Sequence, residues 1–194
     1  MKDLTKGRPS VLILTFALPI FLANLLQLTY SLADTRIVGT FLGDNALAAV
    51  GATTTLSNLI VQFLMGMCNG FAIISAQCFG AKDMDRLRRS LGNSLVLGLL
   101  AAVVLTFGGL VFLQPILRFL NVPENLLNTA TQYVSVIIAG LVVTLLYDVL
   151  AATLRAIGDT VTPLIVLAVS VVLNIGGDLL LIVVLHMGVL GAAV

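Results

Sequence analysis

The chain has 194 residues, of which 59% are hydrophobic and only 10% are charged. Soluble domains carry about 25% charged residues, so this composition excludes a soluble globular domain. The formal net charge is +1, and the few basic residues have no aromatic platform beside them, which argues against a nucleic-acid partner. Long apolar runs between short polar breaks are typical of an all-α integral membrane protein in contact with the lipid bilayer.

Five segments are apolar over the length of about 20 residues that a membrane-spanning helix needs. They cover residues 11–41, 46–79, 91–117, 126–154 and 163–185. The breaks between them contain Gly, Pro, Asn and Asp, which are typical of turns. The run MGVLGAAV then begins a sixth apolar segment. The sequence therefore predicts a polytopic helix bundle of five complete transmembrane helices plus the start of a sixth, and we expect residues 1–194 to be the first part of a longer protein.

The positions of the basic residues predict the orientation in the membrane. Only Arg36 and Arg118 fall on one side of the predicted bundle. The other side has Lys2, Lys6, Arg8, Lys82, Arg86, Arg88, Arg89 and Arg155. Because cytoplasmic loops are the basic ones, we expect a multi-pass protein of the cell membrane with a cytoplasmic N-terminus.

The first predicted helix has a stripe of polar residues. Asn24, Gln27, Ser31 and Asp34 are 3, 4 and 3 residues apart, which puts them within an arc of roughly 80°. Such a stripe faces other helices or a water-filled cavity, so these residues are candidates for lining a substrate cavity. Asp34 either marks the outer end of this helix or lies within a longer, bent helix. Pro19 removes one backbone hydrogen bond and is a candidate hinge.

The fifth predicted helix contains Asn174 and Asp178 one turn apart, on the same face. Asp178 lies about 22 Å along the helix from Pro163 and has apolar residues after it, so it is not a helix end. A buried carboxyl group without a basic neighbour is protonated, or it shares a cation or a polar partner. One interpretation is a hydrogen bond to a neighbouring helix. The other sets Asp34, Asn174 and Asp178 together as an oxygen cluster for Na⁺ or an exchangeable proton.

Other polar residues have weaker signals. Asn58 and Gln62 belong to a second polar seam and are also candidates for lining a cavity. Asp148 lies seven residues before Arg155, and we interpret it as an interfacial charge with Arg155 as its candidate partner. The two cysteines, Cys68 and Cys78, lack the spacing of metal ligands and are expected to be buried or spectator thiols.

Four stretches of the sequence carry a family resemblance. They are ALPIFLANLLQLTYSLADTRIVGTFLGDNALAAVG, GFAIISAQCFGAKD, LRAIGDTVTPL and LNIGGDLLLIVVLHMGVLGAAV, in this order and spacing. With them, the whole chain resembles the multidrug and toxic compound extrusion (MATE) family of secondary transporters. The resemblance implies that residues 1–194 are the N-terminal lobe of a two-lobe, twelve-helix transporter, with the second lobe absent from this sequence.

The resemblance also implies a function. It implies an antiporter that exports amphipathic, often cationic organic compounds, with Na⁺ or H⁺ as the coupling ion and no cofactor. The family's cation site matches Asp34, Asn174 and Asp178 in this sequence, whereas Asp148 stands where the family more usually has Asn.

Two other functions are compatible with a polytopic membrane protein. A flippase for lipid-linked oligosaccharides or polysaccharides has the same broad architecture, but it needs a larger and more basic cavity. Because Arg36 is assigned to one side of the bundle, no intramembrane Lys or Arg is available to hold a diphosphate. An intramembrane enzyme needs a cluster such as DDxxD, HExxH or GxSxG, and none occurs in the sequence. The sequence therefore favours a transporter that is not an enzyme.

Overall fold

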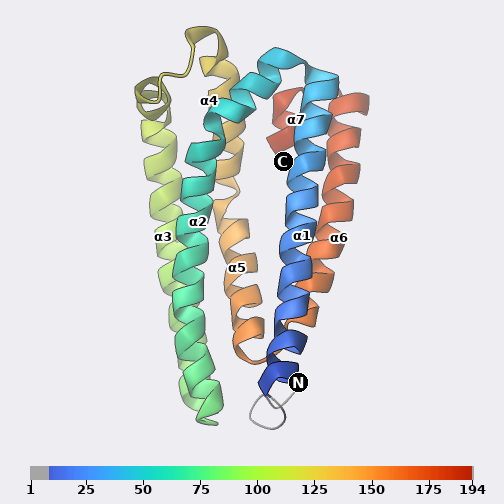
Figure 1. Cartoon of the computed structure of the whole chain (residues 1–194). Helices are drawn as coiled ribbons and strands as arrows, with labels where there is room; N and C mark the ends of the chain where they lie inside the picture. The colour runs from blue at the N-terminus through green and yellow to red at the C-terminus, as the bar shows by residue number, and fades with distance from the viewer. Residues whose placement is uncertain (1–8, 194) are drawn as a thin grey trace.

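The computed structural model describes residues 9–193, which form helices joined by short turns without any strand (Figure 1). The helices are α1 (Pro9–Leu42), α2 (Asp44–Gly80), α3 (Met84–Phe119), α4 (Glu124–Ala139), α5 (Leu141–Ala156), α6 (Val161–Asp178), the π-helix η1 (Leu179–Val184) and α7 (Val189–Ala193). The basic residues Lys2, Lys6 and Arg8, which contributed to the predicted orientation, lie outside the described residues.

The predicted membrane bundle is confirmed. Four helical stretches are long and apolar enough to cross a membrane, namely Ser10–Leu42, Asp44–Gly80, Met84–Phe119 and Val161–Val184. The pair α4 and α5 makes a fifth span if it is counted as one broken crossing. The short helix α7 occupies the predicted start of a sixth segment.

The span predicted as one helix over residues 126–154 is in fact two helices. Gly140 separates α4 from α5, which are bent by 44° relative to each other. The hydroxyl of Thr106 on α3 donates a hydrogen bond of 3.1 Å to the carbonyl of Ile138, near the end of α4. Helix ends leave carbonyl groups without intrahelical partners, and a glycine is a common site of a kink. The break is therefore stabilised by a neighbouring helix, which the local sequence pattern did not indicate.

Helices α2, α3, α4 and α5 share one apolar core, which we call the four-helix core. Its fully buried side chains include Leu64, Ala102, Leu117, Ala130, Val134, Leu141 and Leu145. Two glycines of α3 allow close approach, because a Cβ atom would lie 3.1 Å from Leu145 at Gly98 and 3.0 Å from Ile138 at Gly109. Close packing of this kind, rather than transfer out of water, stabilises helix pairs within a membrane.

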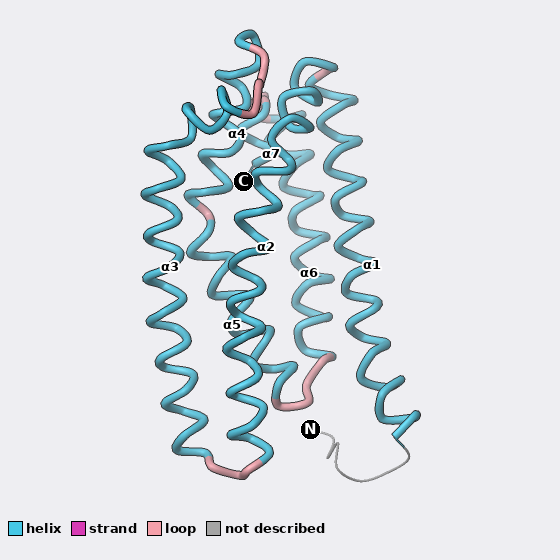
Figure 2. The backbone as a smooth tube through the Cα atoms, turned by 60° about the vertical axis from the view of Figure 1, so that its left-hand side comes forward, coloured by secondary structure: helices cyan, strands magenta, loops and turns pink. Residues whose placement is uncertain are grey.

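Helices α1 and α6 lie side by side and run in the same direction, and we call them the α1–α6 pair (Figures 1 and 2). Val38 is the one buried side chain on the described part of α1, and α6 buries only Pro163 and Asp178. A small apolar cluster connects the pair to the rest of the bundle near α7, and it consists of Val38, Ala46, Val50, Ile182 and Ala192.

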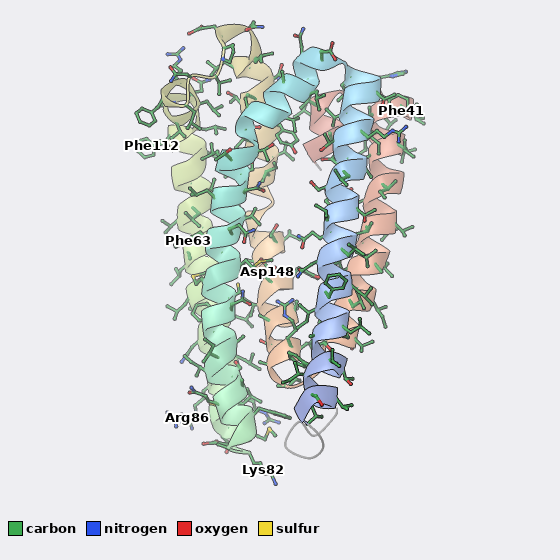
Figure 3. All side chains as sticks on the ribbon, viewed as in Figure 1. Phe41, Phe63, Lys82, Arg86, Phe112 and Asp148 are labelled. Carbon is green, nitrogen blue, oxygen red and sulfur yellow. The ribbon has the colours of Figure 1, made fainter. Side chains whose placement is uncertain are left out.

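The outer surface of the bundle is apolar along its length and basic at one end. Figure 3 shows Phe63 and Phe112 pointing outward, and the side chain of Leu173 on α6 is 70% exposed. Lys82 and Arg86 lie at the end of the bundle where the described chain begins (Figure 3). The apolar girdle and the basic end are the arrangement expected for a bundle that spans a lipid bilayer.

Candidate functional site

The α1–α6 pair brings the three predicted cation-site residues to one place. The carboxyl groups of Asp34 and Asp178 lie within reach of each other's charge, and Asn174 is one turn before Asp178 on α6. Each of the three has a buried side-chain oxygen without a hydrogen-bond partner, and these are Oδ1 of Asp34, Oδ1 of Asn174 and Oδ2 of Asp178. Buried polar atoms are nearly always paired, so three unpaired oxygens in one place require an explanation such as an ion or a proton.

Both carboxyl groups lie within helical spans rather than at their ends. Helix α1 continues from Asp34 to Leu42, which excludes the interpretation of Asp34 as a helix end. Asp178 is 3% exposed and lies at the junction where the α-helical hydrogen bonds of α6 give way to the π-helix η1. The span itself continues to Val184, as predicted. Short π-helical segments occur frequently at functional sites.

Two tyrosines that the sequence analysis did not single out complete this group. Tyr30, one turn before Asp34 on α1, lies near Asn174 and near both carboxyl groups. Tyr133 on α4 lies near Asp34, Tyr30 and Asp178. The position of Tyr30 four residues before Asp34 was a signal that could have found it, because residues at this spacing share a helix face. No sequence signal could have found Tyr133, because its place depends on how α4 packs.

We call Tyr30, Asp34, Tyr133, Asn174 and Asp178 the carboxyl cluster. It offers carboxylate, amide and phenol oxygens, which are the ligands that hard cations prefer. Among residues 9–193, no group of three or more His, Cys, Asp and Glu side chains that could hold a metal ion was found. The donor set fits a monovalent cation such as Na⁺, or a shared proton, better than it fits zinc.

A second polar region lies closer to the basic end of the bundle. It is a cavity of about 70 Å³ between the α1–α6 pair and helices α2 and α5, and we call it the Asp148 cavity. Its lining includes Pro19, Asn24 and Gln27 of α1, so the structure places the lower part of the predicted polar stripe there. Ser31, Asn58 and Gln62 are exposed and are not among its lining residues, and their contact with a substrate stays a prediction.

The prediction that Asp148 is an interfacial charge is wrong. Its side chain is 5% exposed, lines the cavity, and has its Oδ2 atom buried without a hydrogen-bond partner. Figure 3 shows it about half-way along the bundle. Arg155 lies in the last turn of α5, rather than in a loop, and lines the same cavity. Seven residues are nearly two full helical turns, which puts both side chains on one face of α5.

The two cysteines are free and buried, as the sequence predicted. Cys68 is 1% exposed and belongs to the four-helix core, and Cys78 is 5% exposed near the end of α2. Neither is part of the carboxyl cluster.

Comparison with known proteins agrees with this architecture. The MatE family model matches residues 19–180. The chain is 35% identical over 188 residues to the probable multidrug resistance protein YoeA of Bacillus subtilis, which covers 96% of this chain and 40% of YoeA. The crystal structure of a MATE protein in its straight conformation has a TM-score of 0.89 and 28% identity, covering 98% of this chain and 42% of that protein. The bent conformation has a TM-score of 0.87, with the same identity and coverage.

These relatives are named for multidrug resistance or as MATE proteins, which supports the prediction of a transporter rather than an enzyme. The chain spans about 40% of the length of the curated relatives that it matches. Because the family model covers most of the chain and the helical bundle matches throughout, the chain belongs to the MatE family of multidrug and toxic compound extrusion transporters.

Proposed function

We propose that this chain is the N-terminal lobe of an antiporter that exports amphipathic or cationic organic compounds in exchange for Na⁺ or H⁺. In this proposal a second lobe of the same polypeptide completes the transporter. The protein lies in the cell membrane, with the end that contains Lys82 and Arg86 in the cytoplasm. Membership of the MatE family and the multidrug resistance names of its relatives support this function.

The single observation that carries the proposal is the set of three unpaired oxygens on Asp34, Asn174 and Asp178. Two carboxyl groups within reach of each other's charge repel when both are ionised. A bound Na⁺ removes this repulsion and gives each oxygen a partner, and a proton on one carboxyl group achieves the same. The site is therefore most stable when it contains a cation.

Binding of the cation is coupled to export through α1. The Asp34 and Pro19 side chains belong to the same continuous helix, so a pull on Asp34 toward α6 is transmitted to the hinge at Pro19. Bending there changes the position of Asn24 and Gln27 relative to α5 and narrows the Asp148 cavity. A cationic compound competes with Na⁺ or H⁺ because all of them are attracted to the same negative region. A related MATE protein has been crystallised in bent and straight conformations, which supports a bending step.

Asp34→Asn tests the proposal in the complete protein. Ethidium efflux from membrane vesicles is measured under an imposed Na⁺ gradient and, separately, under an imposed pH gradient. We expect Asp34→Asn and Asp178→Asn to abolish efflux under whichever gradient drives the wild type, while the amount of inserted protein is unchanged. Asp44→Asn is the matched control, because Asp44 is exposed in the first turn of α2. Normal efflux by Asp34→Asn would exclude the proposed coupling site.

A further inference from the structure

The Asp148 cavity contains a buried carboxyl group that the proposed coupling site does not use. We propose that Asp148 is a second binding site for a monovalent cation, and that the guanidinium of Arg155 competes with this cation for the carboxylate. The site is separate from the carboxyl cluster, because none of the cluster's residues lines the cavity. Its role in transport rests on the proposed antiport, whereas cation binding itself does not.

The state of the Asp148 carboxyl group supports this proposal. Asp148 is 95% buried, yet its Oδ2 atom has no hydrogen-bond partner, and it opens into a cavity rather than into packed side chains. An unpaired buried carboxylate costs several kcal/mol, so a native structure keeps it only where a partner arrives. The neighbouring buried residues of α5, Leu145, Val149 and Ala152, are apolar. An apolar side chain could therefore be buried at position 148 as well, and the fold alone does not require a carboxyl group there.

The size and the lining of the Asp148 cavity suit a small cation. A volume of about 70 Å³ is enough for roughly two waters at about 30 Å³ each, or for one Na⁺ with a water. Drug-sized ligands need about 300 Å³ or more, so the cavity as it stands takes an ion rather than an organic compound. Neutral oxygen groups surround Asp148 and provide further ligands, and they belong to Asn24, Gln27, Tyr147 and Thr160.

The charges around Asp148 allow Arg155 to compete with a cation. Arg155 is the other charged side chain among the described residues that line the cavity, and it leaves Oδ2 of Asp148 without a hydrogen bond. The remaining titratable groups that face Asp148 are the phenol of Tyr147 and the thiol of Cys68 on α2. The residues that α1 and α6 contribute to the cavity are uncharged. When a cation leaves, the guanidinium of Arg155 is the charged side chain of the cavity lining that can move into its place.

This exchange gives the cavity a function. The cavity lies along α1 between the carboxyl cluster and the basic end, since Gln27 is seven residues, or about 10 Å, before Asp34. A cation released from the carboxyl cluster toward the basic end therefore meets Asp148 next. Arg155 then displaces it, which favours release and opposes the return of the ion.

The test is a count of bound cations in the purified complete protein. Binding of ²²Na⁺ at equilibrium is measured in one arm, and proton uptake after a pH jump in the other. We expect Asp148→Asn to bind one cation fewer than the wild type, Asp34→Asn also one fewer, and the double variant two fewer. Asp148→Glu keeps a carboxyl group and should keep the full count, which separates cation binding from a structural need for a polar side chain.

Variants of Arg155 test the competition. Arg155→Gln removes the competing charge, and we expect the affinity of the Asp148 site to rise about tenfold, whereas Arg155→Lys should leave it close to that of the wild type. Thermal unfolding identifies any variant that fails to fold. An unchanged cation count in folded Asp148→Asn would overturn the proposal, and so would an unchanged affinity in Arg155→Gln. A normal count in Asp34→Asn with a reduced one in Asp148→Asn would instead contradict the proposed coupling site alone.

Discussion

The four-helix core and the α1–α6 pair are built on different principles. Helices α2 to α5 surround fully buried apolar side chains such as Leu64, Leu141 and Leu145, and glycines bring α3 close to α4 and α5. In contrast, Val38 is the one buried side chain on the described part of α1, and one of the two on α6 is a carboxylic acid. A movement of the α1–α6 pair would break few contacts between buried side chains, whereas a movement of the core helices would break many.

The unpaired carboxyl oxygens of the described residues lie where these two parts meet. Asp34 and Asp178 belong to the pair and lie near Tyr133 of the core, while Asp148 belongs to the core and faces a cavity that α1 lines. A seam between a rigid part and a lightly packed part is where a bound ion can alter the position of a helix at small cost. The difference between the two parts therefore supports the proposal that α1 and α6 move while the core stays in place.

Changing the proposed hinge should affect transport rather than stability. Pro19→Ala restores the missing backbone hydrogen bond of α1. The straight helix becomes more stable relative to the bent one, so bending costs more free energy. We expect the efflux rate in the complete protein to fall by about tenfold, which corresponds to about 1.4 kcal/mol on the bending step. Thermal stability should be unchanged or slightly higher. Pro115→Ala, within α3 of the core, is the control and should retain efflux. Equal losses in both variants would contradict a hinge specific to α1.

Removing a buried side chain from the four-helix core should lower the free energy of unfolding much more than removing an exposed side chain from the α1–α6 pair. Leu145→Ala leaves a cavity beside Gly98 and should lower the free energy of unfolding by about 2–5 kcal/mol. Leu173→Ala should cost much less, because that side chain is 70% exposed on α6. Thermal unfolding in detergent can be followed with a thiol-reactive dye, since Cys68 and Cys78 are both buried until the chain unfolds. Similar unfolding temperatures for the two variants would contradict the conclusion that the four-helix core is tightly packed and the α1–α6 pair only lightly packed.

Crowding the core should have the next largest effect on stability. Gly109→Val places a Cβ atom 3.0 Å from Ile138 and should destabilise the fold by about 1–3 kcal/mol. Gly66→Val introduces the same side chain into a helix, but at a position where a Cβ atom would meet nothing within 4 Å. The same dye measurement compares the two variants. If Gly66→Val were as destabilising as Gly109→Val, helix propensity rather than packing would explain both.

Some features of the fold and of the candidate site could be predicted from the sequence, and others could not. Asp34, Asn174 and Asp178 could be predicted because helical spacing and depth in an apolar span are local properties. The break at Gly140 was missed because a hydrogen bond from Thr106 on another helix supports it. The contribution of Tyr133 and the burial of Asp148 were missed for the same reason, since both depend on which helices pack together. Periodicity along one helix contains no information about the helix opposite.

The smallest expected effect concerns the turn between the two parts. Asp159 precedes α6 and accepts hydrogen bonds from the Thr162 hydroxyl and from the backbone N–H groups of Thr162 and Val161, which lower the pKa of its carboxyl group. A lowered pKa means that this stabilisation is present above the unfolded pKa of about 3.9 and is lost as the pH falls through the folded value. Asp159→Ala should therefore lower stability at pH 7 by about 1 kcal/mol or less, the size typical of a side chain that accepts hydrogen bonds from the first N–H groups of a helix, and the difference from the wild type should shrink toward pH 3. Thr162→Val should remove part of the same pH-dependent difference, because it removes the hydroxyl donor. A constant difference across this pH range would mean that Asp159 acts through the shape of the turn and not through its charge.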